Sequence, residues 1–211
     1  MANQIGIFDE IREEAHGREL SMRWYRQKVQ DLLPKPQVRA MIREGVKNQK
    51  VTVRPNFGMM NLFYYRPKGA AKLPYYDIFP LVIPIGRRLN DGFVGLNFHY
   101  LSVPQRWLLL ERLSMFQVPS ELDAFDTGEG AGDVMALFWS KIRRKRGVKP
   151  IVKRYLTKYV QSRFLKIELS EMLIALSIPM ERFYTGKWGG RKKYISEKVY
   201  RQTRREMMSG A

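Results

Sequence analysis

The sequence contains no cysteine and two histidines, His16 and His99, among its 211 residues. Disulfide bonds are therefore excluded, and so are the cysteine- and histidine-rich sites that usually hold zinc. No run of about eighteen apolar residues occurs, so we expect no helix that spans a membrane. The N-terminal stretch is acidic and amphipathic, unlike the basic start and apolar core of a secretory signal. We therefore expect a soluble globular protein made in the cytosol.

Acidic residues are scarce relative to basic ones. The chain carries 38 Lys and Arg against 20 Asp and Glu, a net charge of +18. Apolar residues nonetheless make up 45% and aromatic residues 12% of the chain. Disordered basic tails contain few aromatic residues, so this chain is not one of them. It is long and apolar enough to bury a core, in one large domain or two small ones.

The charge is concentrated in blocks. Residues 141–166 hold eleven bases and no acid, and residues 182–211 hold nine bases and two acids. Residues 1–21 and 110–140 are acidic, with net charges of −3 and −5. Blocks of one sign repel unless opposite charge neutralises them. Two interpretations follow: the basic blocks bind a polyanion such as nucleic acid, or they face acidic segments of the same fold or of neighbouring subunits.

Apolar spacing and composition divide the chain into three parts. We expect an N-terminal helical arm over residues 1–50, a central α+β domain over residues 51–185 and a basic C-terminal helix over residues 186–211. In the arm, apolar residues at helical spacing predict a stripe that docks on a partner protein. These residues are Ile5, Phe8 and Ile11.

The central part begins with β-rich sequence. Three stretches combine β-branched and aromatic residues, at 51–65, 79–85 and 92–100. Pro80 and Pro84 remove two backbone donors, so we expect their strand to be bulged or to lie at an edge. We predict a small, strongly bent β-sheet or an SH3-like barrel within about residues 51–100. Helices surround it, and helical arms lie at both ends of the chain.

Capping and proline signals place the helices that follow. Ser102 and Pro104 predict the start of one helix. Pro150 predicts the start of another, which runs to residue 159. Residues 163–169 alternate in polarity and indicate a strand. The chain closes with a basic pattern that predicts a helix over residues 192–208.

No pattern in the sequence indicates catalysis. His99 has no carboxylate or serine motif near it in the sequence and is typical of a structural histidine. Asp77 and Asp91 are too isolated for the carboxylate cluster of a metal-dependent nuclease, and Asp91 is explained by a tight turn. The glycine-rich residues 128–133 lack the lysine and hydroxyl residue of a phosphate loop. We therefore expect a protein that is not an enzyme, with no catalytic residue, no metal site and no cofactor.

The basic blocks supply the candidate nucleic-acid contacts. On the helix predicted from Pro150, Lys149, Lys153 and Lys158 fall close to one face that suits a phosphate backbone. We find no dependable helix-turn-helix pattern, so we expect double-stranded DNA to be bound without sequence specificity. The predicted contact residues are Arg143, Arg144, Lys145, Arg146, Lys149, Lys153, Arg154, Lys158, Arg191, Lys192 and Lys193.

Three segments of the central part form a distinctive string. They read NLFYYRPK at residues 61–68, LPYYDIFPL at 73–81 and DGFVGLNFHYL at 91–101. Shorter pieces fit the same pattern, namely KRYL at 153–156, SRF at 162–164 and PMERF at 179–183. Over residues 55–185 the chain resembles structural proteins of contractile-tailed, T-even-like bacteriophages, of the DNA end-protector type or of a small tail or baseplate type.

The resemblance implies a bacteriophage virion or virion-assembly protein without catalytic residues. It also implies manufacture in the host cytoplasm, other virion proteins as partners and no membrane association. Together with the basic blocks, it favours a structural protein that contacts DNA non-specifically, in DNA end protection or head completion. The alternative is a tail, neck or baseplate subunit whose charge blocks pair with acidic neighbouring subunits.

Overall fold

The computed structural model describes part of the chain. The described residues are 21, 23–25, 27–28, 50–88, 92–114, 146–168, 171–186 and 192–209. Most of the predicted arm, with Ile5, Phe8 and Ile11, lies outside them, and so does the glycine-rich segment 128–133. Within the described part, no helix is both long and apolar enough to cross a membrane.

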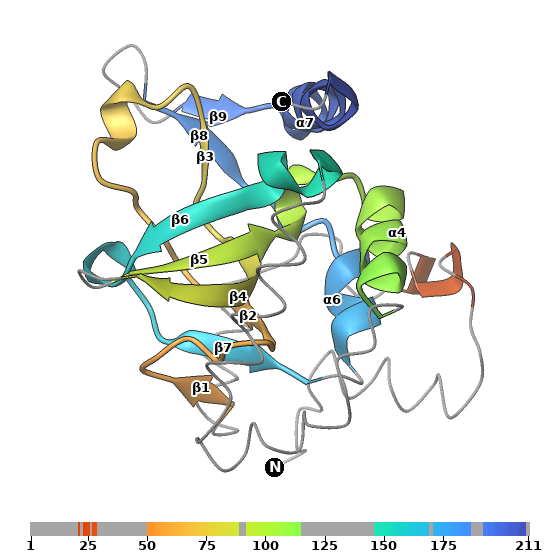
Figure 1. Ribbon diagram of the computed structural model, residues 1–211, viewed down its shortest axis with the longest axis horizontal. Helices are drawn as coiled ribbons and strands as arrows, with labels where there is room; N and C mark the ends of the chain where they lie inside the picture. The colour runs from red at the N-terminus through yellow and green to blue at the C-terminus, as the bar shows by residue number, and fades with distance from the viewer. Residues whose placement is uncertain are drawn as a thin grey trace, which may run out of the picture.

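Six antiparallel strands form the main sheet. They are β1 (Val51–Thr52), β2 (Met60–Leu62), β4 (Leu81–Arg88), β5 (Gly92–Asn97), β6 (Val152–Leu156) and β7 (Phe164–Ile167). Their order across the sheet is β1-β7-β2-β4-β5-β6 (Figure 1). The two long strands β4 and β5 pair from Val82 opposite Asn97 to Arg88 opposite Gly92, as the composition of these stretches predicts.

Strand β4 lies between β2 and β5, so the predicted edge position is wrong and the predicted bulge is confirmed. The register shifts between Pro84 and Gly86. The missing donor of Pro84 is therefore accommodated at an irregularity, and the Pro84 carbonyl accepts a hydrogen bond from the Gly58 amide at 3.0 Å. Opposite Pro84, a Cβ on Gly95 would lie 2.2 Å from Val82 Cγ1, which explains the glycine there.

The helix predicted from Pro150 to residue 159 is wrong. Pro150 lies inside the 3-10 helix η4 (Arg146–Ile151), and the following residues form strand β6, which pairs with β5. A second 3-10 helix, η5 (Thr157–Tyr159), ends the segment. Pairing with the open side of β5 satisfies the backbone of this segment and overrides its local spacing. The predicted helical face of Lys149, Lys153 and Lys158 therefore does not exist.

The sheet is not confined to residues 51–100, because β6 and β7 come from residues 152–167 and β7 lies between β1 and β2. The alternating strand at 163–169 is thus confirmed. Among the described strands, β1 and β6 end the sheet without pairing to each other. The α+β class is confirmed, but the described strands do not form a closed barrel.

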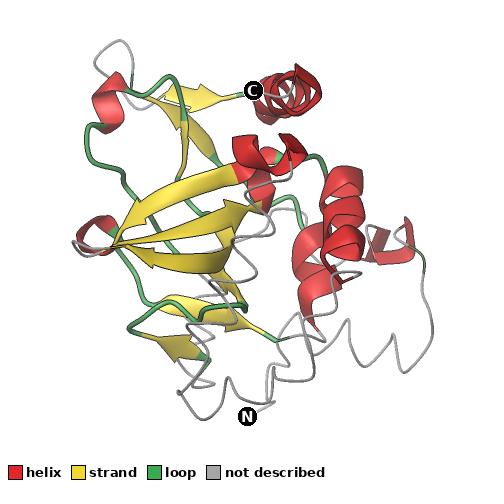
Figure 2. Cartoon of the chain, viewed as in Figure 1, coloured by secondary structure: helices red, strands yellow, loops and turns green. Residues whose placement is uncertain are grey.

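A second antiparallel sheet and several helices complete the described part, and residues 23–25 and 27–28 are also helical. The strands are β3 (Tyr76–Asp77), β8 (Phe183–Thr185) and β9 (Lys192–Tyr194), in the order β3-β8-β9. The labelled helices are α4 (Val103–Ser114), α6 (Met172–Ser177) and α7 (Ser196–Ser209). The 3-10 turn η1 (Ala70–Lys72) lies between β2 and β3, and η2 (Phe98–Tyr100) connects β5 to α4. Figure 2 shows the strands on one side of the molecule and α4 and α6 on the other.

The predicted start of α4 is confirmed. The backbone amide and the hydroxyl of Ser102 both donate to Gln105 Oε1, at 3.1 and 2.8 Å. This contact covers an otherwise free donor just before the first turn, as in a capping box. Pro104 lies in the first turn, where a missing amide hydrogen costs nothing.

The sheet buries apolar side chains on both faces, because neighbouring residues of a strand point to opposite sides. Leu62 lies in the larger core with Leu96 and the helices, whereas the adjacent Phe63 lies in a smaller aromatic core. There, Phe63 contacts Tyr155 and Phe93 with ring centres 5.3 and 5.9 Å apart. These two cores fix the ends of β6, where the charged turns begin.

Candidate nucleic-acid interface

One side of α7 is held on the fold by buried contacts. Val199 and Thr203 are buried, and α7 packs against η4 and η2. Tyr200 donates a hydrogen bond to Glu181 and accepts one from Arg106 of α4 at 3.4 Å. The predicted basic helix is thus confirmed from Ser196 onward, whereas residues 192–194 form strand β9.

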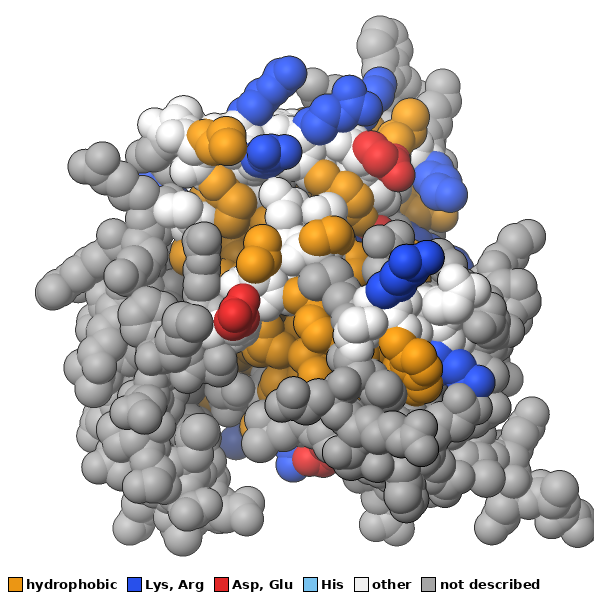
Figure 3. All heavy atoms as spheres, turned by 90° about the vertical axis from the view of Figure 1, so that its right-hand side faces the viewer, with side chains coloured by type: hydrophobic (Ala, Val, Ile, Leu, Met, Phe, Trp, Pro, Cys, Tyr) orange, Lys and Arg blue, Asp and Glu red, His pale blue; other side chains and the backbone are white. Residues whose placement is uncertain are grey.

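The opposite side of α7 is exposed and basic. Its bases recur at helical spacing, and the turn that packs against α7 adds one more exposed lysine. We call this set the helix surface: Lys149, Lys198, Arg201, Arg204 and Arg205. Figure 3 shows Lys and Arg side chains gathered along the top of the molecule, where α7 lies, together with an acidic side chain. The two basic blocks of the sequence, 141–166 and 182–211, therefore meet here.

Several predicted contact residues cannot be placed or are placed by their backbone alone. Those outside the described residues are Arg143, Arg144, Lys145 and Arg191. Arg146 belongs to η4 and Lys192 to β9.

The remaining predicted contacts are divided among separate elements. Lys149 is exposed in η4, Lys158 is exposed in η5 at the other end of β6, and Lys193 is exposed in β9. Arg154 is exposed on β6 itself. The structure thus brings Lys149 to α7 and separates it from Lys158.

Lys153 is largely buried between the two sheets. Its ammonium group lies 4.0 Å from the centre of the Tyr100 ring, and no described carboxylate forms an ion pair with it. Burial lowers the pKa of Lys153 to about 8, and the nearby charge of Glu206 opposes this shift. The same surroundings raise the pKa of Tyr75 to about 12, mainly by burial.

The buried position of Lys153 predicts a stability that rises with pH. Between about pH 8 and 10.5 the unfolded chain holds a proton on this lysine that the folded chain has lost, so unfolding becomes less favourable. We expect a gain of about 2 kcal/mol between neutral pH and the onset of tyrosine ionisation near pH 10. Urea unfolding of Lys153→Met should show no such rise, whereas the exposed control Lys158→Met should retain it. An equal rise in both variants would contradict this assignment.

The structure also gathers bases that the sequence prediction left out. They are exposed on the turns between strands, namely between β1 and β2, between β2 and β3, and, with Lys158, between β6 and β7. We call this set the rim surface: Arg54, Arg66, Lys68, Lys72, Lys158 and Arg163. The signal that could have found it is the absence of Asp and Glu from residues 50–76, which hold five bases.

Asp77 and His99 form a buried pair. Asp77 Oδ2 lies 2.9 Å from His99 Nδ1 and accepts a hydrogen bond from Asn97 Nδ2 at 3.2 Å. The Phe79 amide donates to the other oxygen at 3.0 Å. The structural role expected for His99 fits its complete burial, although its partner lies 22 residues away in the sequence. Asp91 lies outside the described residues.

These buried groups do not build a metal centre in the described part of the chain. No group of three or more His, Asp or Glu residues is placed there to hold a metal ion. Asp77 instead has its oxygens directed at neighbouring donors. The helix surface and the rim surface are two exposed clusters of bases in the described part.

The fold and these surfaces define a basic α+β protein with clustered, exposed cations. A comparison with protein families then identifies the family: the one described as phage T4 terminal DNA protecting protein matches residues 11–203, and the chain belongs to it. The resemblance to the DNA end-protector type is thereby confirmed, and with it a bacteriophage structural protein. In the same comparisons, no curated protein and no solved structure matched the chain.

Proposed function

We propose that this protein contacts double-stranded DNA near its end, in the virion, through the helix surface. The observation that supports this most directly is the packing of α7 on η4, which brings the turn that carries the exposed Lys149 against the basic helix. The charges alone leave the nature of the polyanion open. The family description, phage T4 terminal DNA protecting protein, supports DNA as that polyanion.

The helix surface suits phosphate rather than base recognition. From Lys198 to Arg205 its cations extend about 10 Å along the helix axis, at 1.5 Å per residue. Duplex DNA carries one negative charge per about 1.7 Å of its axis, so several phosphates lie within reach of this row. Contacts to phosphate position a protein on DNA without reading sequence. Binding is therefore independent of sequence.

The salt dependence of binding tests this proposal. Five phosphate contacts predict a slope of about −4.5 for log K against log salt, or a loss of about 500-fold in affinity between 50 and 200 mM salt. The full chain is titrated onto a short blunt-ended duplex over this range. Arg201→Gln/Arg205→Gln should reduce the slope by about 1.8. The matched control Arg23→Gln/Lys166→Gln removes two exposed or half-exposed bases elsewhere and should leave it unchanged.

Protection of the DNA end has its own readout. The bound chain is expected to slow the removal of terminal nucleotides from linear duplex by an added exonuclease, and the Arg201→Gln/Arg205→Gln variant is expected to lose this effect. Absence of binding even at low salt would refute the proposal. It would favour the alternative, a tail, neck or baseplate subunit that pairs with an acidic neighbour through its basic blocks or through Ile5, Phe8 and Ile11.

A further inference from the structure

The rim surface is built on turns that the backbone ties together. The Arg66 amide donates to the Tyr159 carbonyl at 3.1 Å, and the Gln161 amide donates to the Tyr64 carbonyl at 2.8 Å. Ser162 Oγ accepts a hydrogen bond from the Tyr64 amide at 2.8 Å. The segment that carries Arg66 and the one that carries Lys158 and Arg163 are thus fixed side by side. Their cations are displayed on a shared, ordered edge.

No described carboxylate neutralises this edge. The ion pairs within the described part involve other cations, namely Lys50, His99, Arg106 and Lys166. Of the two acids nearest in sequence, Asp77 is buried and bonded to His99, and Glu168 pairs with Lys166. Six exposed cations without such partners repel one another, and a polyanion relieves this repulsion.

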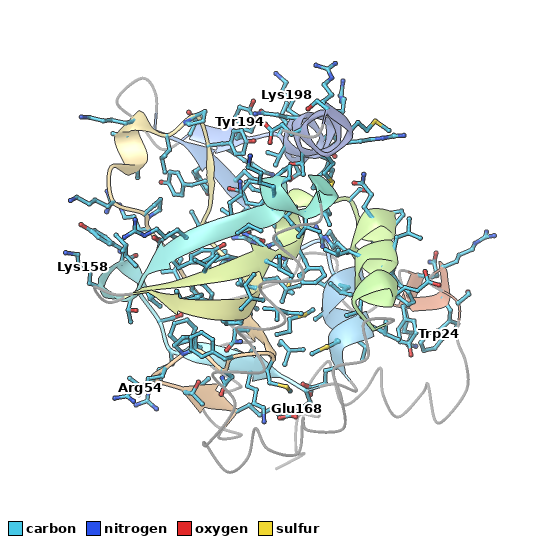
Figure 4. All side chains as sticks on the ribbon, viewed as in Figure 1. Trp24, Arg54, Lys158, Glu168, Tyr194 and Lys198 are labelled. Atoms are coloured by element: carbon cyan, nitrogen blue, oxygen red, sulfur yellow. The ribbon has the colours of Figure 1, made fainter. Side chains whose placement is uncertain are left out.

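The rim surface and the helix surface lie at opposite ends of β6. Helix α7 packs on η4, which precedes β6, whereas Lys158 lies in η5, which follows it. The five residues of β6 span about 17 Å at 3.3 Å per residue. Figure 4 shows Lys198 at the top of the molecule, and Lys158 and Arg54 at its left and lower left.

The two surfaces also differ in direction. Helix α7 is seen almost end-on in Figure 1, so its row of cations runs along the line of sight. The rim surface instead extends down the left side of the picture, from η1 at the upper left to Arg54 at the lower left in Figure 4. Duplex DNA bends little over such distances, since its persistence length is about 50 nm. A duplex that follows α7 therefore does not also cover the rim surface.

We infer that the rim surface binds the phosphate backbone of a second segment of duplex DNA, so that one chain holds two segments together. This inference rests on the proposed function, in which the helix surface holds the first segment. The chemistry is the same at both surfaces: exposed guanidinium and ammonium groups donate to phosphate oxygens, without sequence preference. The protein then links two duplex segments and also binds DNA near its end.

Co-capture of two duplexes tests the inference. A duplex attached to beads is incubated with the full chain and with a second, fluorescent duplex at about 0.1 M salt, and the retained fluorescence is measured. Each phosphate contact contributes a factor of about eight in affinity at this salt concentration. Arg66→Gln/Lys158→Gln should therefore lower co-capture by tenfold or more. The largest expected loss is the product of the factors for the two lost phosphate contacts. The control Arg23→Gln/Lys166→Gln should retain it.

Each outcome separates the inference from the proposed function. The inference is supported if the rim variant still binds one duplex through the helix surface but loses co-capture. It is overturned if the rim variant co-captures as well as the wild type, or if the wild type binds one duplex and never two. It is also overturned, in favour of a second copy as the occupant, if the wild type sediments as a dimer without DNA and the rim variant as a monomer. Absence of any duplex binding would instead refute the proposed function.

Discussion

Replacing Arg106 by alanine is expected to lower the free energy of unfolding by about 4 kcal/mol. Arg106 is fully buried. Its hydrogen bonds reach the carbonyl oxygens of Leu101, Leu176 and Ile178, the carboxylate of Glu181 and the hydroxyl of Tyr200, at 2.8–3.4 Å. The alanine variant leaves these acceptors without their donor and Glu181 without its counter-charge. Since small domains are stable by about 5–15 kcal/mol, urea unfolding should show a large shift of the midpoint.

Two comparisons isolate the cause of this loss. Leu108→Ala alters the same helix at a side chain that is 51% exposed and should cost less than about 0.5 kcal/mol. Burial alone would raise the pKa of Glu181, but the charge of Arg106 lowers it, so their pairing is present at neutral pH and is lost in acid. Adding Glu181→Gln to Arg106→Ala should therefore recover part of the stability. Equal losses in Leu108→Ala and Arg106→Ala would contradict the role of Arg106.

The sequence predicts where α4 begins but not what it buries. Ser102 and Pro104 are local signals, and they place the start of the helix correctly. The apolar pattern includes Leu108, which is half exposed, and gives no reason to bury Arg106. Two of the carbonyl groups that accept its hydrogen bonds lie at the C-terminal end of α6, 70 and 72 residues later in the chain. A local sequence pattern therefore cannot predict these hydrogen-bond acceptors, because only the tertiary fold brings them to Arg106.

The charged surfaces are predictable in composition and not in arrangement. The basic blocks of the sequence do contain the exposed cations of η4, β6 and α7. Their arrangement depends on whether residues 152–156 form a helix or a strand. A helix would align Lys149 with Lys158, whereas strand β6 places them at opposite ends. The deciding factor is the hydrogen-bonding partner β5, which lies about 60 residues earlier in the chain.

The rim surface shows a second limit of the same kind. Its bases come from residues 54–72 and 158–163, which are separated by about 90 residues of sequence. The first group is too sparse to form a charge block, whereas Lys158 and Arg163 belong to the basic block 141–166. The contacts between Tyr64 and Arg66 on one side and Tyr159 and Gln161 on the other bring them together. In the sequence, the first group is marked by the absence of acidic residues rather than by a high density of bases.

Replacing Asp77 by alanine is expected to cost about 3 kcal/mol of stability. The change removes the acceptor of three buried donors, on Phe79, Asn97 and His99, and leaves each in an environment without water. Asn97 also donates to the hydroxyl of Tyr155 at 3.0 Å, so the loss extends into the smaller aromatic core. Urea unfolding at neutral pH measures the effect.

The conservative change Asp77→Asn distinguishes the contribution of the side chain's shape from that of its charge. It keeps the shape and one acceptor oxygen but loses the charge beside His99, so about half of the alanine effect is expected. Both variants, when folded at low temperature, should bind duplex DNA as the wild type does, because Asp77 is 4% exposed and lies in neither charged surface. An unfolding midpoint unchanged by Asp77→Ala would contradict the structural role. So would magnesium-dependent cleavage of linear DNA that disappears in Asp77→Asn, because both oxygens of this buried carboxylate are already engaged by neighbouring donors.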